Sequence, residues 1–129
     1  MRDRPSGSEL LREARRVLRE ELADELEGEQ RFKALMAANA MAMAMRELDE
    51  GDRPLRREFG ALTRLLGQTP ASEQDMASLV AALRELNQRL ARDIREGRWD
   101  GTEEVHSALI DETRDRVKES NPKALENSV

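Results

Sequence analysis

The stretch LMAANAMAMAM, Leu35 to Met45, decides how the whole chain is interpreted. It holds four methionines and five alanines around one asparagine, in a chain where 38% of residues are charged. The alternation of MAMAM suits a strand, but the uninterrupted segment between Gly28 and Gly51 is several times longer than a strand of about five or six residues. Methionine and alanine are also strong helix formers, whereas strands favour branched and aromatic residues. The stretch therefore predicts a helix over about residues 29–49.

This helix carries large apolar side chains on opposite sides. At about 100° per residue they form two ridges: Met41, Met45 and Leu48 on one side, and Phe32, Met36 and Met43 on the other. Alanines fill the gaps between the ridges. Because a helix that is apolar all round is normally buried all round, we predict that residues 29–49 form a central helix covered by the other helices or by a second subunit.

Composition predicts one all-α domain spanning residues 1–129. Aromatic residues are only 2% of the chain, and Ala, Leu, Glu and Arg dominate, a balance typical of helices with charged faces. The net charge of -5 argues against a nucleic-acid partner, which requires clustered positive charge. The absence of cysteine excludes disulfides and thiolate chemistry and suits a reducing compartment.

Glycines and capping residues divide the chain into about five helices. Helical periodicity ends at each of four glycines, where a left-handed C-cap is expected: Gly28, Gly51, Gly67 and Gly97. Ser6 followed by Glu9 predicts a capping box at the first helix. We expect Thr69 or Ser72 to cap the fourth helix, which runs to about residue 96, and Asp100 to cap the fifth. Residues 1–6 and 121–129 are expected to be flexible or loosely docked tails.

The fourth helix has the most regular apolar pattern. Its expected core residues recur at heptad spacing, which suits a seam against a partner helix: Met76, Leu79, Val80, Leu83, Leu86, Leu90 and Ile94. The third helix, from about residue 52 to 66, contains Gly60 in its interior. An interior glycine costs about 1 kcal/mol against alanine, so either a neighbouring backbone approaches Gly60 or the helix is locally weak there.

Asn39 and the methionines beside it admit more than one interpretation. A buried amide must find a partner, so Asn39 either bonds a neighbouring helix or water, lines a ligand pocket, or fixes the register of a dimer. The methionines Met36, Met41, Met43 and Met45 suit core packing, a dimer seam, or a soft pocket wall. A pocket of Met36, Asn39 and Met43 would suit an acyl chain.

Two further candidates lie in the C-terminal part. Glu103 and His106 have the Glu-x-x-His spacing of di-iron carboxylate bundles, but one chain supplies only one such motif. We therefore favour the interpretation that both are surface residues suited to a helix N-terminus. Trp99, the sole tryptophan, lies between the last two helices and either plugs the end of the bundle or anchors an interface. No cofactor motif and no nucleophile with a histidine partner is present in the sequence.

The sequence carries no sign of export or membrane insertion. The stretch MRDRPSGSELLREARR lacks the apolar segment of a signal peptide, and no run approaches the roughly 20 apolar residues that span a bilayer. We therefore expect a cytoplasmic protein with no membrane partner.

Three segments together resemble a bacterial family of short, acidic, all-helical proteins of unknown function: RPSGSELLREARRVLREEL, GEQRFKALMAANAMAMAMRELDEG and SNPKAL. The resemblance spans nearly the whole chain and is weaker over residues 53–74. Genes of that family often lie beside acyl-CoA dehydrogenases and aminoglycoside-phosphotransferase-like proteins, which implies a shared pathway or complex. Members commonly have an aromatic residue where Ala124 stands here, so the resemblance leaves the docking of this tail open.

These observations favour a non-catalytic accessory or interaction protein, with a partner enzyme of the dehydrogenase-like or phosphotransferase-like kind. The methionine helix or the exposed side of the fourth helix would supply the contact. Two alternatives stay open: a small-molecule binder or weak enzyme with its pocket around Met36, Asn39 and Met43, and a structural homodimer.

Overall fold

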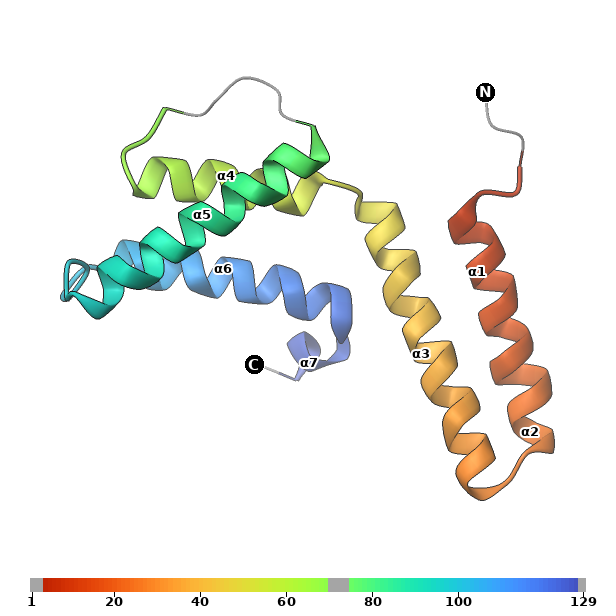
Figure 1. Cartoon of the computed structure of the whole chain (residues 1–129). Helices are drawn as coiled ribbons and strands as arrows, with labels where there is room; N and C mark the ends of the chain where they lie inside the picture. Colours follow the sequence, from red (N-terminus) through yellow and green to blue (C-terminus); the bar gives the residue numbers. More distant parts are fainter. Residues whose placement is uncertain (1–3, 70–74, 128–129) are drawn as a thin grey trace. The chain divides into compact units, whose positions relative to one another are not determined.

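Helices joined by turns make up the part of the chain that the structure describes. The computed structural model describes residues 4–69 and 75–127, and these contain no strand. The helices are α1 (Gly7–Arg16), η1 (Val17–Leu22), α2 (Ala23–Glu25), α3 (Gly28–Glu50), α4 (Arg53–Leu65), α5 (Met76–Arg95), α6 (Glu103–Ser120) and α7 (Lys123–Glu126), and Figure 1 labels α1 to α7. The predicted all-α class is confirmed.

The chain divides into two compact units, Met1–Gly51 and Asp52–Val129. The first holds α1 to α3, and the second holds α4 to α7. We describe each unit by itself.

The first unit is a helical hairpin. The nearly continuous helix from α1 through η1 to α2 runs back along α3 (Figure 1). The side chains buried between the two arms are small, namely Ser8, Ala23, Ala34 and Ala38. Because small side chains let helix axes approach closely, this contact buries backbone and alanine rather than large apolar groups.

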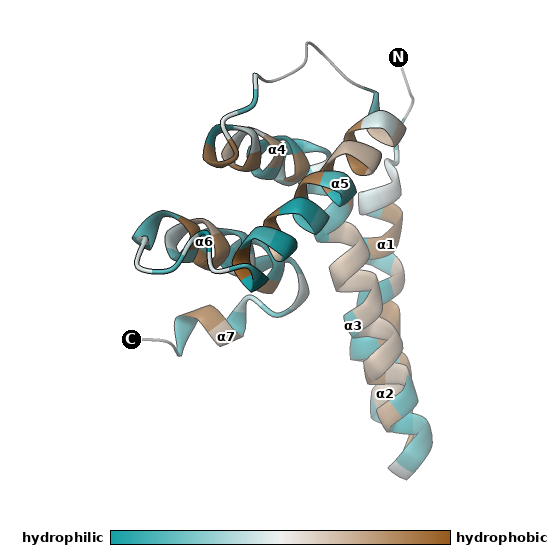
Figure 2. Ribbon diagram, turned by 60° about the vertical axis from the view of Figure 1, so that its left-hand side comes forward, coloured by the Kyte–Doolittle hydropathy of each residue, from teal (hydrophilic) through white to brown (hydrophobic). Residues whose placement is uncertain are grey.

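Within the first unit by itself, a single arm covers the Met/Ala-rich helix; that the other helices or a second subunit cover it all round stays a prediction. Within the hairpin, Phe32 is 63% exposed, Met36 is 53% exposed and Met43 is 43% exposed. Met41 and Met45, on the other ridge, are half-buried. Figure 2 shows the middle of α3 in the pale brown of alanine and methionine. A helix in a hairpin has one covering arm, which covers Met41 and Met45 in part, whereas Leu48 at the end of the same ridge is 57% exposed.

The start of the hairpin follows the capping rules. The Oγ of Ser6 accepts the N–H of Glu9 at 3.2 Å, and the carboxylate of Glu9 accepts the N–H of Ser6 at 2.7 Å. This confirms the predicted capping box. Satisfying both donors stabilises the first turn by about 1 kcal/mol.

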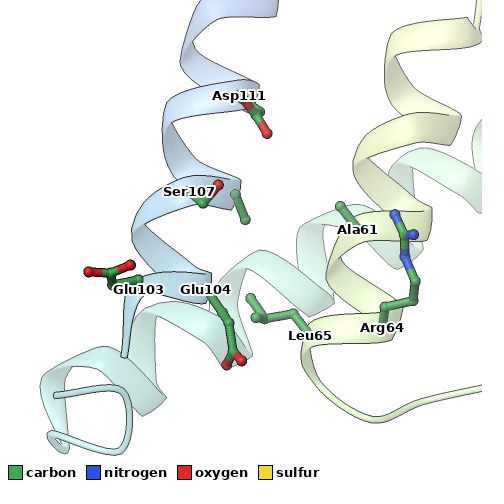
Figure 3. Close-up of a pocket in the computed structure, with 8 residues that line it drawn as sticks. Ala61, Arg64, Leu65, Glu103, Glu104, Ser107 and Asp111 are labelled. Atoms are coloured by element: carbon green, nitrogen blue, oxygen red, sulfur yellow. The ribbon is translucent and has the colours of Figure 1, made fainter. Parts of the chain in front are cut away.

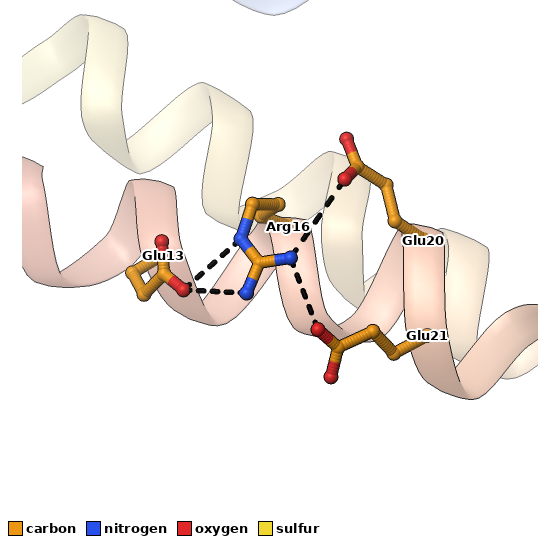
Figure 4. Close-up of polar contacts among 4 residues, drawn as sticks. All are labelled: Glu13, Arg16, Glu20 and Glu21. Carbon is orange, nitrogen blue, oxygen red and sulfur yellow. Dashed lines mark hydrogen bonds and ion pairs between the residues drawn. The ribbon is translucent and has the colours of Figure 1, made fainter.

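The π-helical segment η1 is a feature that the sequence pattern did not predict. A π-helix places residues five apart on one face, and Arg16 accordingly reaches Glu21 at 3.0 Å, as well as Glu13 at 2.7 Å and Glu20 at 3.8 Å (Figure 4). The hydrogen bonds and charge of Arg16 lower the pKa of Glu13. These groups are exposed, so their contribution to folding is small.

The hydrophobic core lies in the second unit. Its buried members come from α4, α5 and the first turn of α6: Leu62, Leu66, Leu79, Leu83, Leu86, Leu90 and Val105. The heptad seam on α5 is thus confirmed at its four leucines. Met76, Val80 and Ile94 are exposed instead, because they flank the seam or lie at the ends of the helix.

Several helix boundaries differ from the prediction. Asp75, not Thr69, caps α5 by accepting the N–H of Ser78 at 2.8 Å, and Ser72 lies outside the described residues. Thr102, not Asp100, precedes α6. Of the expected tails, residues 1–3 and 128–129 lie outside the described part. Pro122 is the N-cap of the short helix α7, which packs on α6. The four glycines predicted to end helices all have positive φ.

Candidate functional site

An open groove runs between α4 and α6 of the second unit. Figure 3 shows Ala61 and Arg64 on α4 across from Ser107 and Asp111 on α6, with Leu65 and Glu104 at one end. The full lining is Ala61, Arg64, Leu65, Glu103, Glu104, Ser107, Ala108 and Asp111. The groove thus has an apolar floor and a charged rim.

Small and apolar residues shape the floor of the groove. Ala61 and Ala108 leave space between the two helices, and Leu65 packs against the core beneath. Next to the groove, Arg57 of α4 and Asp115 of α6 form an ion pair at 3.0 Å. This pair joins the two helices at the surface, although an exposed pair of this kind contributes about 0–1 kcal/mol.

The rim of the groove is predominantly acidic. Its lining includes Glu103, Glu104 and Asp111 and one cation, Arg64. Asp111 is also ion-paired at 3.7 Å with Arg114, which lies outside the groove. The Nε of Arg64 donates to the carbonyl of Gly60 at 3.1 Å, so its guanidinium lies along its own helix. Such a rim favours a ligand or partner segment that carries positive charge.

A second group of polar side chains lies where α4, α5 and α6 meet. Asn87 of α5 donates to the Oε1 of Glu58 on α4 at 2.7 Å. Burial raises the pKa of Glu58, and the negative charge of Glu112 on α6 adds to this effect. Neither glutamate lines the groove. We therefore interpret this junction as structural rather than as an acid–base site.

Asp93 is a buried acid that the sequence analysis missed. Its carboxylate is 3.3 Å from Arg98 and 3.9 Å from Arg89, which compensates its charge. Asp93 follows Leu79 and Leu86 at the heptad interval. Continuing the seven-residue interval from Leu86 would have predicted that Asp93 is buried.

Trp99 packs against the core of the second unit at the turn between α5 and α6. Its indole N–H is buried without a hydrogen-bond partner. The contact of the Trp99 ring with the core is the packing expected of a plug.

Glu103 and His106 are both exposed in the first turn of α6. Glu103 lines the groove and His106 does not. Within residues 4–69 and 75–127, no group of three or more His, Asp or Glu side chains is arranged to hold a metal ion.

The methionine helix carries Asn39 on its exposed side. Within the first unit Asn39 is exposed, on the face that the hairpin leaves uncovered, and its expected burial stays a prediction. Met36, Asn39 and Met43 do not line the groove between α4 and α6, nor a pocket between α4 and α5, nor one at the start of α1. The acyl-chain pocket stays a prediction.

None of the helices in the described part of the chain combines the length and hydrophobicity that a bilayer span requires.

Comparison with known proteins identifies the family. The model of the family named "Domain of unknown function (DUF6285)" matches residues 24–124. The chain belongs to this family. No curated protein and no solved structure matches the chain.

The DUF6285 match shows which parts of this fold define the family. It begins in α2 and ends in α7, so it contains the whole methionine helix, the core of the second unit and the α4–α6 groove. It also crosses the boundary between the two units. The DUF6285 region therefore comprises both units, without α1 and η1.

Proposed function

We propose that this chain is a non-catalytic interaction protein whose α4–α6 groove binds a basic amphipathic helix of a partner enzyme. The observation that carries the proposal is the combination of an apolar floor, at Ala61, Leu65 and Ala108, with an acidic rim. Apolar centres bordered by polar residues are the usual organisation of protein interfaces. An amphipathic helix lays its apolar face into such a groove and its charges along the rim.

The kind of partner follows from charge and from the family resemblance. Glu103 and Glu104, together with Asp111 and its partner Arg114, leave the rim acidic, which favours a segment rich in Lys or Arg. The partner enzyme we propose is of the acyl-CoA dehydrogenase-like or aminoglycoside-phosphotransferase-like class, because genes of these classes often lie beside those of the bacterial family that the chain resembles. A bacterial, cytoplasmic protein is part of the same proposal.

Reversal of charge on the rim tests this function. A Glu104→Lys/Asp111→Lys variant should lose at least tenfold in affinity for the purified partner enzyme, measured by calorimetry or by co-elution at micromolar concentration. Binding by the unaltered protein should weaken as salt rises, because rim charges are screened beyond about 10 Å at 0.1 M salt.

The matched control is Glu25→Lys/Glu27→Lys, which makes the same change of net charge at exposed positions of the first unit. It should leave affinity within about twofold. The proposal fails if neither class of enzyme binds the unaltered protein, or if the two double variants weaken binding equally.

A further inference from the structure

A second pocket of the second unit lies between α4 and α5. Its volume is about 420 Å³, within the range of pockets that hold small molecules. None of the residues that line it also lines the α4–α6 groove. A ligand in this pocket would therefore be additional to the partner helix of the proposed function.

The floor of the α4–α5 pocket is apolar. Leu86 on α5 is a buried member of the leucine core, and Phe59 on α4 packs against that core. Thr63, also in the lining, is buried, and its hydroxyl already donates to the carbonyl of Phe59 at 2.8 Å. The floor thus offers a ligand apolar surface rather than hydrogen bonds.

The rim of the pocket supplies the hydrogen-bond donors. Arg92 of α5 borders the pocket together with the amides of Gln68 and Gln88. In the part of the chain that the structure describes, the side chains of these three residues have no hydrogen-bond or ion-pair partner. They are therefore available to a ligand without the loss of an existing contact.

The charges around the pocket leave one positive charge over. Arg89 and Arg92 line it together with a single acid, Glu85. Asp93 lies 3.9 Å from Arg89 but outside the lining, and Arg98 holds its carboxylate at 3.3 Å. One net positive charge matches a monoanion, whereas a dianion would meet Glu85 with its second charge uncompensated.

The order of these groups along α5 separates the charged end of the pocket from the apolar part. Ala82, Leu86 and Arg92 all line the pocket. Ala82 and Arg92 are ten residues apart, so about 15 Å separates them along the helix axis. A ligand with its anionic group at Arg92 would have its body over Leu86, pointing towards Ala82.

We propose that the α4–α5 pocket binds a small amphipathic monocarboxylate. The carboxylate binds the guanidinium of Arg92, and the hydrocarbon body packs on Phe59 and Leu86. A guanidinium can hold a carboxylate through two parallel N–H donors, which fixes orientation as well as affinity. Burial of the hydrocarbon body on the apolar floor supplies the remaining affinity.

Nuclear magnetic resonance titration of the full chain at pH 7 tests the ligand class. Octanoate should give saturable shifts of the backbone amides of Leu86, Arg89 and Arg92 at millimolar concentration or below. Octanamide has the body without the charge, and inorganic phosphate has charge without the body, so each should bind at least tenfold more weakly. Absence of saturable shifts with octanoate, or equal binding by octanamide or phosphate, would overturn the proposal.

Replacement of the cation tests where the carboxylate binds. Arg92→Gln should weaken octanoate binding at least tenfold and leave the affinity for octanamide within about twofold. Arg95→Gln is the matched control, because it removes the same charge from an exposed position of α5 outside the pocket. It should leave octanoate affinity within about twofold. Equal losses in the two variants would mean that the net charge of the chain, and not the pocket, attracts octanoate.

A larger side chain in the apolar part tests where the body lies. Ala82→Leu should fill the space beside Leu86 and weaken octanoate binding at least tenfold, with unchanged helical circular dichroism. Ala81→Leu, at the exposed neighbouring position outside the pocket, should bind octanoate as the unaltered protein does. Undiminished binding by Ala82→Leu would place the ligand elsewhere and refute the proposed site.

Discussion

Asn87 of α5 donates a 2.7 Å hydrogen bond to Glu58 of α4. This bond links two helices that are also held by the leucine core, at the point where Glu112 of α6 brings a second carboxylate near. Partial burial and the neighbouring carboxylate of Glu112 both disfavour the charged form of Glu58. The stability of the second unit should therefore depend on the protonation of Glu58.

Replacing Glu58 by glutamine removes this dependence. The pKa of Glu58 is raised in the folded state, so its favourable contribution is present below the unfolded pKa and is lost as pH rises through the folded pKa. Glu58→Gln keeps an acceptor for Asn87 and should raise the free energy of unfolding by about 0.5 kcal/mol at pH 7, a value reduced for partial exposure. Urea denaturation followed by Trp99 fluorescence measures this, since the only tryptophan packs on the core of the second unit.

The same denaturation near pH 4 is the comparison for the measurement at pH 7. There the gain from Glu58→Gln should disappear, because the natural carboxyl is then largely protonated. The exposed Glu85→Gln should change stability at neither pH. An equal gain at both pH values would mean that the raised pKa is not its cause.

Gly60 should be a position where alanine stabilises the protein. It lies inside α4 without a positive φ, and a Cβ there would meet no atom within 4 Å. Gly60→Ala should therefore raise the free energy of unfolding by about 1 kcal/mol through helix propensity. Gly67→Ala is the matched comparison, because Gly67 also has open space but a φ of +65°. It should instead destabilise by about 1 kcal/mol. If both changes have the same sign in thermal unfolding, backbone conformation does not explain them.

Leu79 and Val80 are adjacent on α5, but Leu79 lies in the core and Val80 on the surface. Leu79 is only 1% exposed, whereas Val80 lies on the outer face of α5. Leu79→Ala should cost about 3 kcal/mol, from lost burial and the cavity that remains. Val80→Ala should cost about 0.5 kcal/mol or less. Equal losses in chemical denaturation would show that Val80 is buried in solution.

Local rules accounted for most of the helices. Ser6 and Glu9 predicted the first helix start because capping involves groups three residues apart. The glycines at 51, 67 and 97 predicted helix ends because a positive φ is a property of one residue, whereas Gly28 has a positive φ but is the first residue of α3. Where such signals competed, prediction failed: Thr69, Ser72 and Asp75 all suit an N-cap, and Asp75 is the one observed for α5.

One residue of the groove could be anticipated from the sequence, whereas the polar junction could not. Glu103 was singled out from its spacing to His106, and it lines the groove beside residues of α4 that no sequence pattern connects to it. Glu58 and Asn87 are far apart in sequence, and their hydrogen bond depends on how α4 and α5 pack. Contacts of this kind are set by the rotation of each helix about its axis, which propensity does not specify.

The sequence by itself determined that the chain is helical, where most helices begin and end, and that α5 carries a leucine seam. Only the tertiary structure decided which apolar surfaces are covered. Phe32, Met36 and Met43 have the character of core residues and yet are exposed, while the leucines of α5 are buried. The physical reason is that helix formation depends on neighbours within a few residues, whereas burial depends on a second surface brought to the helix by folding or by association.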